Sequence, residues 1–443
     1  MRSLESRRLA SSAVSSPEPR ARARERAALL AAFAALVYFP ILAHHSLRVA
    51  WDPQEDFPSF YFAARAAANG GVSPYDVTGL TRLARVAGLE QRIFPFLYPP
   101  PTLALLRPLA ALPYRSASLA LMALNQLALL CTAWWICRKI VPPARWASTP
   151  FALLALGYSF LFTPAVETLD LGQTDLLVGA CVVGAWVALR EPQRDGLAGA
   201  LLGVACLLKL YLVLVLAALL LRRRFRVVAL AGAVIGAFAL AALALAPRST
   251  WAEWLGQVAP SGSYGHVPRG LDWIGLVHPA NQSLAGLFAR LTAPEGPLAA
   301  WPSLLVPLDW LAAGACTAGA AWALLRARRR PNLELGAELS LALLTAYLVA
   351  PFSWNHHLVF LSAVGVLSLA FAFESEGDAQ LGPWVRATIA AAALILAWDL
   401  PLDLPLLRRG AWALMSSLKC LAVLSLWAFY LQRTATGACS ARV

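Results

Sequence analysis

Charged residues are scarce in this chain of 443 residues: they make up 14% of it, whereas a soluble globular protein has about 25%. Hydrophobic residues make up 59%, and the mean hydropathy is +0.62. Apolar runs of about 17–25 residues recur along the chain, which is the length that crosses roughly 30 Å of hydrocarbon. These features exclude a water-soluble globular protein and predict an integral membrane protein.

Paired cysteines are also lacking. The seven cysteines lie almost entirely inside apolar runs, and none has the spacing of a metal site. They are Cys131, Cys137, Cys181, Cys206, Cys316, Cys420 and Cys439. We therefore predict small buried packing residues, no disulfides and no metal ligated by cysteine.

The net charge of +13 does not indicate a nucleic-acid partner, because the basic residues form tight clusters between apolar runs. These clusters are Arg138 with Lys139, Arg222 to Arg224 with Arg226, and Arg326 with Arg328 to Arg330. Such clustering is typical of cytoplasmic loops in membrane proteins. It predicts a multi-pass protein of the bacterial plasma membrane, with both termini in the cytoplasm.

The predicted fold is an all-α bundle of about twelve transmembrane helices in one domain, residues 27–433. We expect residues 1–26 to be disordered and residues 434–443 to form a cytoplasmic tail. Two long loops, residues 48–114 and 247–301, are predicted on the outer side with short helices of their own, and residues 98–112 as a re-entrant or interfacial hairpin. Basic residues flank residues 196–221 on both sides, which predicts two short helices meeting near Lys209. The remaining spans are predicted at 27–47, 115–137, 148–166, 173–190, 227–246, 302–325, 335–351, 357–373, 384–400 and 409–431.

The first outer loop offers three acids, Asp52, Glu55 and Asp56, directly after the first span. Asp56 precedes a segment, residues 57–69, with helical spacing of Phe60 and small residues. One interpretation is that Asp56 caps this helix, since aspartate before proline is a common N-cap. The other is a carboxylate that faces a cavity and acts as a general base.

Lys209 is a lone charge inside an apolar run. Such a charge costs at least about 2.5–3.5 kcal/mol in a bilayer, so it requires a partner or a water-filled cavity. A phosphate is a natural partner, and snorkelling to the interface is the alternative. Tyr211 follows it, and Tyr98 precedes three prolines that predict an extended entry into a short helix.

Amides and histidines gather at the outer ends of later spans. Gln173 lies in the segment ETLDLGQTD beside Glu167, Asp170 and Asp175, and a turn with Asn355, His356 and His357 joins two spans. Adjacent side chains on a helix diverge by about 100°, so we expect the two histidines to bind a phosphate rather than chelate one metal ion. Asn281 and Gln282 close the second long loop and add another polar set.

These segments resemble glycosyltransferase family 87, in the GT-C superfamily of transferases that use polyprenyl-phosphate sugars. The resemblance lies in DFPSFYFAARAAANGGVSPYD, LYPPPTLALLRPLAALP, GQTD, AGALLGVACLLKLYLVLVLAALLLRRRFR, NQS and SWNHH, in that order over roughly residues 50–375. It implies a GT-C-like bundle and direct transfer, with inversion, of a hexose such as mannose from a polyprenyl-phosphate donor to a lipid or glycan acceptor at the outer face.

The resemblance also assigns roles to residues. Asp56 would be the general base, although Asp52 and Glu55 keep that assignment open. Lys209 with His356 or His357 would hold the donor phosphate. The substrate-binding residues would be Tyr61, Arg65, Tyr98, Gln173, Tyr211, Asn281, Gln282 and Asn355. No cofactor is implied and no metal ligands are assigned, while metal dependence stays open; the expected partners are the donor, the acceptor and membrane lipids, without nucleic acid.

Two other functions account for part of the pattern. A transporter or flippase of lipid-linked saccharides would share the spans, the buried lysine and a polar cavity, but would not need a carboxylate at the start of the first-loop helix. A purely structural membrane subunit would account for the spans but not for the clustered polar groups.

Overall fold

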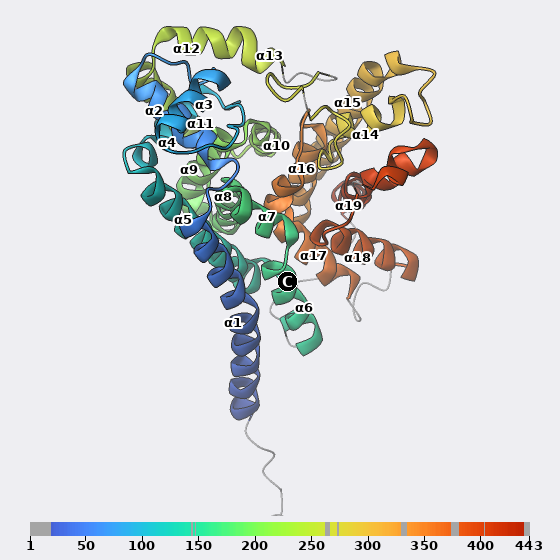
Figure 1. Ribbon diagram of the computed structural model, residues 1–443. Helices are drawn as coiled ribbons and strands as arrows, with labels where there is room; N and C mark the ends of the chain where they lie inside the picture. The colour runs from blue at the N-terminus through green and yellow to red at the C-terminus, as the bar shows by residue number, and fades with distance from the viewer. Residues whose placement is uncertain are drawn as a thin grey trace, which may run out of the picture.

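The computed structural model describes residues 19–142, 145–146, 148–261, 266–272, 274–328, 335–373, 381–402 and 404–437. Within these ranges the chain is helical, and its one β-type pairing is an isolated bridge between Asn281 and Trp354. Helices of membrane-spanning length run roughly alongside one another, and shorter helices gather at one end (Figure 1). The all-α prediction is confirmed for this part of the chain.

Seven helical segments of the described residues are long and apolar enough to cross a membrane. They are Glu25–Trp51 (in α1, Pro19–Trp51), Tyr114–Ile140 (α5, Tyr114–Trp135, with the π-helix η1, Ile136–Ile140), Thr149–Leu171 (α6, Thr149–Phe160, with α7, Thr163–Leu171), Phe225–Leu245 (α11), Pro302–Ala327 (η6, Pro302–Leu304, with α15, Leu305–Ala327), Asn355–Ala372 (η7, Asn355–Leu361, with α17, Ser362–Ala372) and Gly410–Thr436 (η9, Gly410–Ser417, with α19, Leu418–Thr436).

Shorter apolar helices complete the bundle. They are α8 (Asp175–Ala188), α9 (Asp195–Leu208), η4 (Leu210–Leu212) with α10 (Val213–Leu221), α16 (Leu335–Val349) and α18 (Pro383–Ala397). Short 3₁₀ turns, η3 (Pro192–Arg194) and η8 (Pro405–Arg408), join neighbouring segments. The structure therefore supports a multi-pass membrane protein.

One end of the bundle carries the helices of the two long loops, and we call it the loop end. These helices are α2 (Phe57–Asn69), α3 (Val77–Val86), α4 (Pro100–Ala110), α12 (Arg248–Glu253), η5 (Trp254–Val258), α13 (Ala259–Ser261) and α14 (Leu284–Thr292). The opposite end, which we call the basic end, carries Arg138, Lys139, Arg222–Arg226 and Arg326. Figure 1 shows α1 running from the basic end to the loop end.

The helices α9 and α10 form the predicted pair, with Lys209 in an extended conformation between them (φ −143°, ψ 96°). A Cβ atom at Gly199 or Gly203 would lie 2.6 or 2.9 Å from a backbone oxygen of α11. These two glycines therefore let α9 and α11 pack backbone to backbone. Arg224, just before α11, lies 3.7 Å from Asp195 at the start of α9, so α10 must return to the basic end.

Two other expectations differ from the structure. Residues 19–26, predicted to be disordered with residues 1–18, form the start of α1, while residues 1–18 lie outside the described residues. Residues 98–112 contain a single helix, α4 (Pro100–Ala110), in place of a hairpin, because Pro99 to Pro101 fix one helix start and the chain turns only after Ala110. The apolar side of α4 packs on α2 and α11.

Candidate active site

The carboxylate of Asp56 faces the interior of the loop end. Its backbone N–H donates to the carbonyl of Leu171 (2.8 Å), which fixes the start of α2 against the end of α7. Its side chain forms no capping hydrogen bond with α2. One oxygen accepts a hydrogen bond of 2.7 Å from Nε2 of Gln173 instead. The helix-cap interpretation of this side chain is therefore wrong, and the carboxylate is held for another purpose.

A left-handed glycine places Gln173. Helix α7 ends at Gly172, whose φ of +71° strains any residue with a side chain. A Cβ atom there would also lie 2.6 Å from the side chain of Gln54, which donates to the carbonyl of Leu169. The side-chain amide of Asn125 donates to the backbone oxygen of Gln173 (2.8 Å). The tight turn thus aims the Gln173 amide at Asp56 and starts α8 two residues later.

The ammonium group of Lys209 is buried with a carboxylate beside it. Nζ of Lys209 lies 3.2 Å from Oδ1 of Asp175, the first residue of α8, and the two side chains are 4% and 0% exposed. The ring of Tyr98 lies 5.6 Å from the same nitrogen. The break between α9 and α10 is what turns Lys209 into the bundle. Since an ammonium has three donors, the pair with Asp175 orients it and leaves it able to bind an anion.

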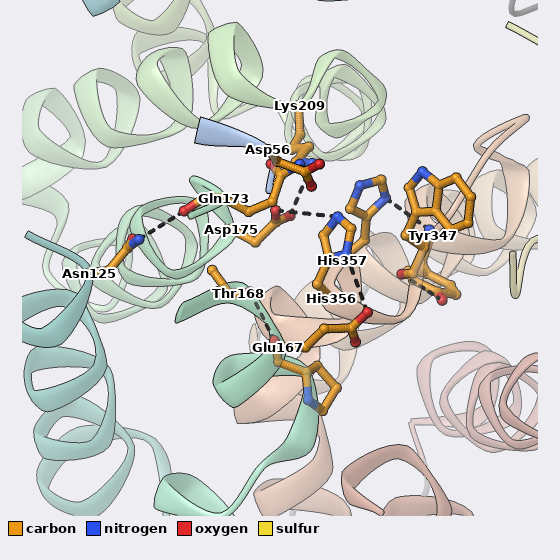
Figure 2. Close-up of polar contacts among 12 residues, drawn as sticks. Asp56, Asn125, Glu167, Thr168, Gln173, Asp175, Lys209, Tyr347, His356 and His357 are labelled. Atoms are coloured by element: carbon orange, nitrogen blue, oxygen red, sulfur yellow. Dashed lines mark hydrogen bonds and ion pairs between the residues drawn. The ribbon is translucent and has the colours of Figure 1, made fainter. Parts of the chain in front are cut away.

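The two histidines lie on the 3₁₀ helix η7 and are both buried. Nε2 of His356 lies 4.0 Å from Asp175 and Nδ1 lies 3.7 Å from Glu167, and neither nitrogen has a hydrogen-bond partner in the described part of the chain. Figure 2 shows the ring between these two carboxylates. The ring thus lies at ion-pair distance from two carboxylates without a hydrogen bond to either, which leaves its nitrogens available to a ligand.

The expected divergence of the histidines is wrong. Each of Asp175, His356 and His357 offers a possible metal-ligand atom, and these atoms lie within 4.8 Å of one another. However, Nδ1 of His357 accepts a hydrogen bond from the backbone N–H of Trp354 (3.3 Å). Its proton is therefore on Nε2, which can donate but cannot ligate a metal. With Lys209 beside Asp175 as well, this set fits an oxyanion better than a metal ion.

Partial burial raises the pKa of Asp56 above that of an ordinary aspartate. The nearby His356, the hydrogen bond from Gln173 and the charge of Lys209 oppose this effect by favouring the ionised form. The outcome is a carboxylate that is more basic than usual and still stabilised as an anion. That combination suits a group that must accept a proton near neutral pH.

Seven of the predicted residues come together here. They are Asp56, Tyr98, Gln173, Lys209, Tyr211, His356 and His357. The ring of Tyr211 lies 5.9 Å from that of His357, and its hydroxyl has no hydrogen-bond partner in the described residues. Asn355 precedes His356 on η7, and its Oδ1 also lacks one.

Two predicted residues hold the histidine turn from behind. Oδ1 of Asn281 accepts from the backbone of Ser353 (3.2 Å), and the backbone of Gln282 donates to Ser353 (2.7 Å). The Gln282 side chain contacts only backbone groups, at Pro279, Ser416 and Cys420. The side chains of Asn281 and Gln282 therefore form a scaffold for the neighbouring backbone, and their contact with substrate stays a prediction.

Tyr61 and Arg65 lie on α2 away from this cluster. The Tyr61 side chain is buried among aromatic rings, and its hydroxyl accepts a hydrogen bond from Arg65 (2.6 Å). Conversely, Asp175 and Glu167 are site residues that sequence reasoning noted only as neighbours of Gln173. The signal that could have identified Asp175 is the buried Lys209, because such a charge needs a counter-ion.

The comparisons with known proteins agree with this geometry. A protein-family model described as "Glycosyltransferase family 87" matches residues 96–351. No solved structure matches the chain.

Two curated relatives share the description "Polyprenol-phosphate-mannose-dependent alpha-(1-2)-phosphatidylinositol mannoside mannosyltransferase". The protein from Mycobacterium tuberculosis (strain ATCC 25618 / H37Rv) is 30% identical over 317 residues, which cover 68% of this chain and 66% of the relative. The protein from Mycolicibacterium smegmatis (strain ATCC 700084 / mc(2)155) is 27% identical over 322 residues, which cover 69% and 67%. The match thus spans about two thirds of each relative's length.

Proposed function

The chain belongs to glycosyltransferase family 87, and from this premise we propose that it is a membrane glycosyltransferase. It transfers a hexose, mannose by analogy with the relatives, from a polyprenyl-phosphate donor to a lipid or glycan acceptor. The observation that carries this proposal is the Asp56 carboxylate, fixed by Gln173 beside the buried cation Lys209 and the imidazole of His356. A base next to donors for an anion is the arrangement that sugar transfer from a phosphate requires.

Asp56 removes the proton of the acceptor hydroxyl as its oxygen attacks the anomeric carbon of the donor sugar. Its raised pKa makes it a stronger base than an ordinary aspartate. The hydrogen bond from Gln173 occupies one carboxylate oxygen and leaves the other for the acceptor. Direct attack of this kind inverts the configuration at the anomeric carbon.

Lys209 and His357 stabilise the leaving polyprenyl phosphate. As the bond between the anomeric carbon and the phosphate oxygen breaks, negative charge grows on that oxygen. The ammonium of Lys209 and the Nε2–H of His357 are fixed donors in a site with little water, where such interactions are strongest. His356, with both nitrogens free of hydrogen bonds within the described chain, can donate to the same phosphate or to a sugar hydroxyl.

We place the active site at the outer face of a bacterial plasma membrane. Basic clusters such as Arg222 to Arg224 mark the basic end as cytoplasmic by the positive-inside rule. The loop end, with Asp56 and the histidines, then faces outward. A donor that carries its sugar on a lipid anchor suits that face, because soluble nucleotide sugars are made in the cytoplasm.

The experiment that tests the function is transfer of radiolabelled mannose from polyprenyl-phosphate-mannose to membrane lipids by the purified protein. We expect the wild type to form a labelled glycolipid. Asp56→Asn should lower kcat by about 10²–10⁴, the typical contribution of a general base.

Asp52→Asn and Glu55→Gln are matched controls, because both acids are exposed on the same segment. They should keep activity near that of the wild type. If Asp56→Asn is fully active and one of the two controls is inactive, the general base is the residue changed in that control. Movement of the lipid-linked sugar across vesicles without a new glycosidic bond would favour the transporter.

A further inference from the structure

A second polar recess lies at the loop end, apart from the site described above. It has a volume of about 530 Å³ and lies between the C-terminal ends of α2 and α4. Its lining consists of Arg65, Ala68 and Asn69 from α2 and of Arg107, Ala110, Ala111, Leu112 and Pro113 from the end of α4 and the turn after it. This volume is within the range of about 300–1,000 Å³ typical of small-molecule sites.

Two arginines give the recess its charge. Within the described residues, neither Arg65 nor Arg107 forms an ion pair with a carboxylate, and no acidic side chain lines the recess. Arg107 lies in the last turn of α4, where a cation stabilises the helix end. Arg65 lies a full turn before the end of α2 and has no such role. Arg65 is exposed and Arg107 is half-buried, so water can solvate both, but their guanidinium groups line one recess and can together offer donors to an oxyanion.

The guanidinium of Arg65 is held in place. It donates to the hydroxyl of Tyr61 (2.6 Å), and that hydroxyl donates to the carbonyl of Leu112 (2.8 Å) in the turn after α4. Tyr61 itself is buried among the rings of Phe57, Phe62 and Tyr114. This relay fixes one arginine across the two helices, so little side-chain entropy is lost when an anion binds.

Small residues leave room beside the charges. Ala68, Ala110 and Ala111 line the recess where larger side chains would fill it. Helices α2 and α4 lie next to each other at the loop end, at the opposite end of α1 from its N-terminus (Figure 1). Pro113 of the lining immediately precedes the candidate span Tyr114–Ile140, so we expect the recess to lie at the level of the lipid headgroups.

We propose that this recess binds the phosphodiester headgroup of the acceptor lipid, an inference that rests on the proposed function. Arg65 lies nine residues beyond Asp56, about 13 Å along a helix at 1.5 Å per residue. A headgroup phosphate bound at Arg65 would lie about this distance from Asp56, and the glycan attached to the headgroup would span it to reach the base. The acceptor and donor phosphates thus occupy separate sites, the acceptor at Arg65 and Arg107 and the donor at Lys209.

The test compares the wild type with the double variant Arg65→Gln/Arg107→Gln. Loss of a charge-assisted hydrogen bond lowers affinity about tenfold or more. We therefore expect the KM for the acceptor lipid to rise at least tenfold and the KM for the polyprenyl-phosphate donor to stay unchanged. The control is Arg82→Gln/Arg85→Gln on α3, where two exposed arginines lie outside the recess. It should match the wild type in both KM values.

A binding measurement separates this inference from the proposed function. Native mass spectrometry of the full chain with phosphatidylinositol should show at least tenfold weaker binding to the recess variant than to the wild type and the control. This readout is independent of transfer, so a wild type without mannosyltransferase activity would still test the recess.

Three outcomes would overturn the proposal. One is unchanged acceptor KM and unchanged phosphatidylinositol binding in the recess variant. Another is a rise in the donor KM alone, which would assign the recess to the donor. The third is that the recess variant keeps the acceptor KM of the wild type but is no longer activated by anionic lipids in general, such as phosphatidylglycerol. That result would mean that the recess binds the surrounding membrane lipid and not the acceptor.

Discussion

Two buried polar clusters at the loop end differ in how fully their groups are paired. In the scaffold formed by Asn281 and Gln282, every side-chain oxygen and nitrogen has a hydrogen-bond partner, mostly a backbone group. In the site, the nitrogens of His356, the hydroxyl of Tyr211 and an oxygen of Gln173 have none within the described chain. The first cluster holds the backbone in place, and we expect a substrate to supply the missing partners in the second.

The largest effect is expected at the ion pair of the site. Lys209→Met leaves the fully buried carboxylate of Asp175 without its cation, which costs about 3–5 kcal/mol of unfolding free energy. Transfer activity should be lost as well. The double variant Lys209→Met/Asp175→Asn should recover most of the stability but no activity, measured by thermal unfolding in detergent and by mannose transfer. Recovery of activity in the double variant would mean that Lys209 does not bind the donor phosphate.

A different pattern, lower stability with unchanged substrate binding, is expected in the scaffold. Gln282→Leu leaves the backbone groups at Pro279, Ser416 and Cys420 without their partner. Each group left without a partner costs about 1–3 kcal/mol, so the melting temperature should fall. The donor KM of the molecules that remain folded should equal that of the wild type. A raised donor KM with an unchanged melting temperature would mean that Gln282 binds substrate, as the sequence had suggested.

The smallest effect is expected at Gln173, whose side-chain nitrogen is hydrogen-bonded while its side-chain oxygen has no partner within the described chain. Its hydrogen bond favours the ionised form of Asp56, so Gln173→Leu raises the pKa of Asp56 further. Activity requires the ionised base and is lost as the pH falls through this pKa. The acid limb of kcat/KM should therefore move to higher pH, because the lost hydrogen bond no longer stabilises the charged form of the base.

The contrast between Gln173→Leu and the wild type should disappear at alkaline pH, where Asp56 is ionised in both. If the acid limb of kcat/KM lies at the same pH in the variant as in the wild type, Gln173 does not influence the pKa of the base. A uniform loss of rate at every pH would indicate a role in substrate binding.

Much of this organisation could be predicted from the sequence because it depends on local signals. The basic flanks of residues 196–221 predicted the break at Lys209, and the spacing of small residues predicted the bounds of α2. Lys209 stood out because a lone charge in an apolar run needs a partner, and Asp56 because it directly precedes the helical segment 57–69. The pairing of Lys209 with Asp175 depends on how α8 packs against α9, which is a tertiary property without a local signal.

The different roles of polar residues were harder to predict for the same reason. Asn281 and His356 are both polar residues at span ends, and only the packed structure shows that one is paired and the other is not. The direction of the two histidines was predicted wrongly because helical spacing sets only where each Cβ atom points, and the side-chain torsions bring a nitrogen of both imidazoles within 4.8 Å of Asp175.

The short helices α9 and α10 also bear on how the protein is made. At 1.5 Å per residue the 14 residues of α9 and the 12 residues of η4 with α10 reach about 21 and 18 Å, and neither crosses about 30 Å of hydrocarbon alone. The two must enter the membrane together as a hairpin. Lys209, at its tip, is synthesised after Asp175, its partner in the finished structure. We therefore expect this ion pair to lower the cost of bringing Lys209 into the membrane, and its loss to reduce the insertion of newly made chains before any sugar is transferred.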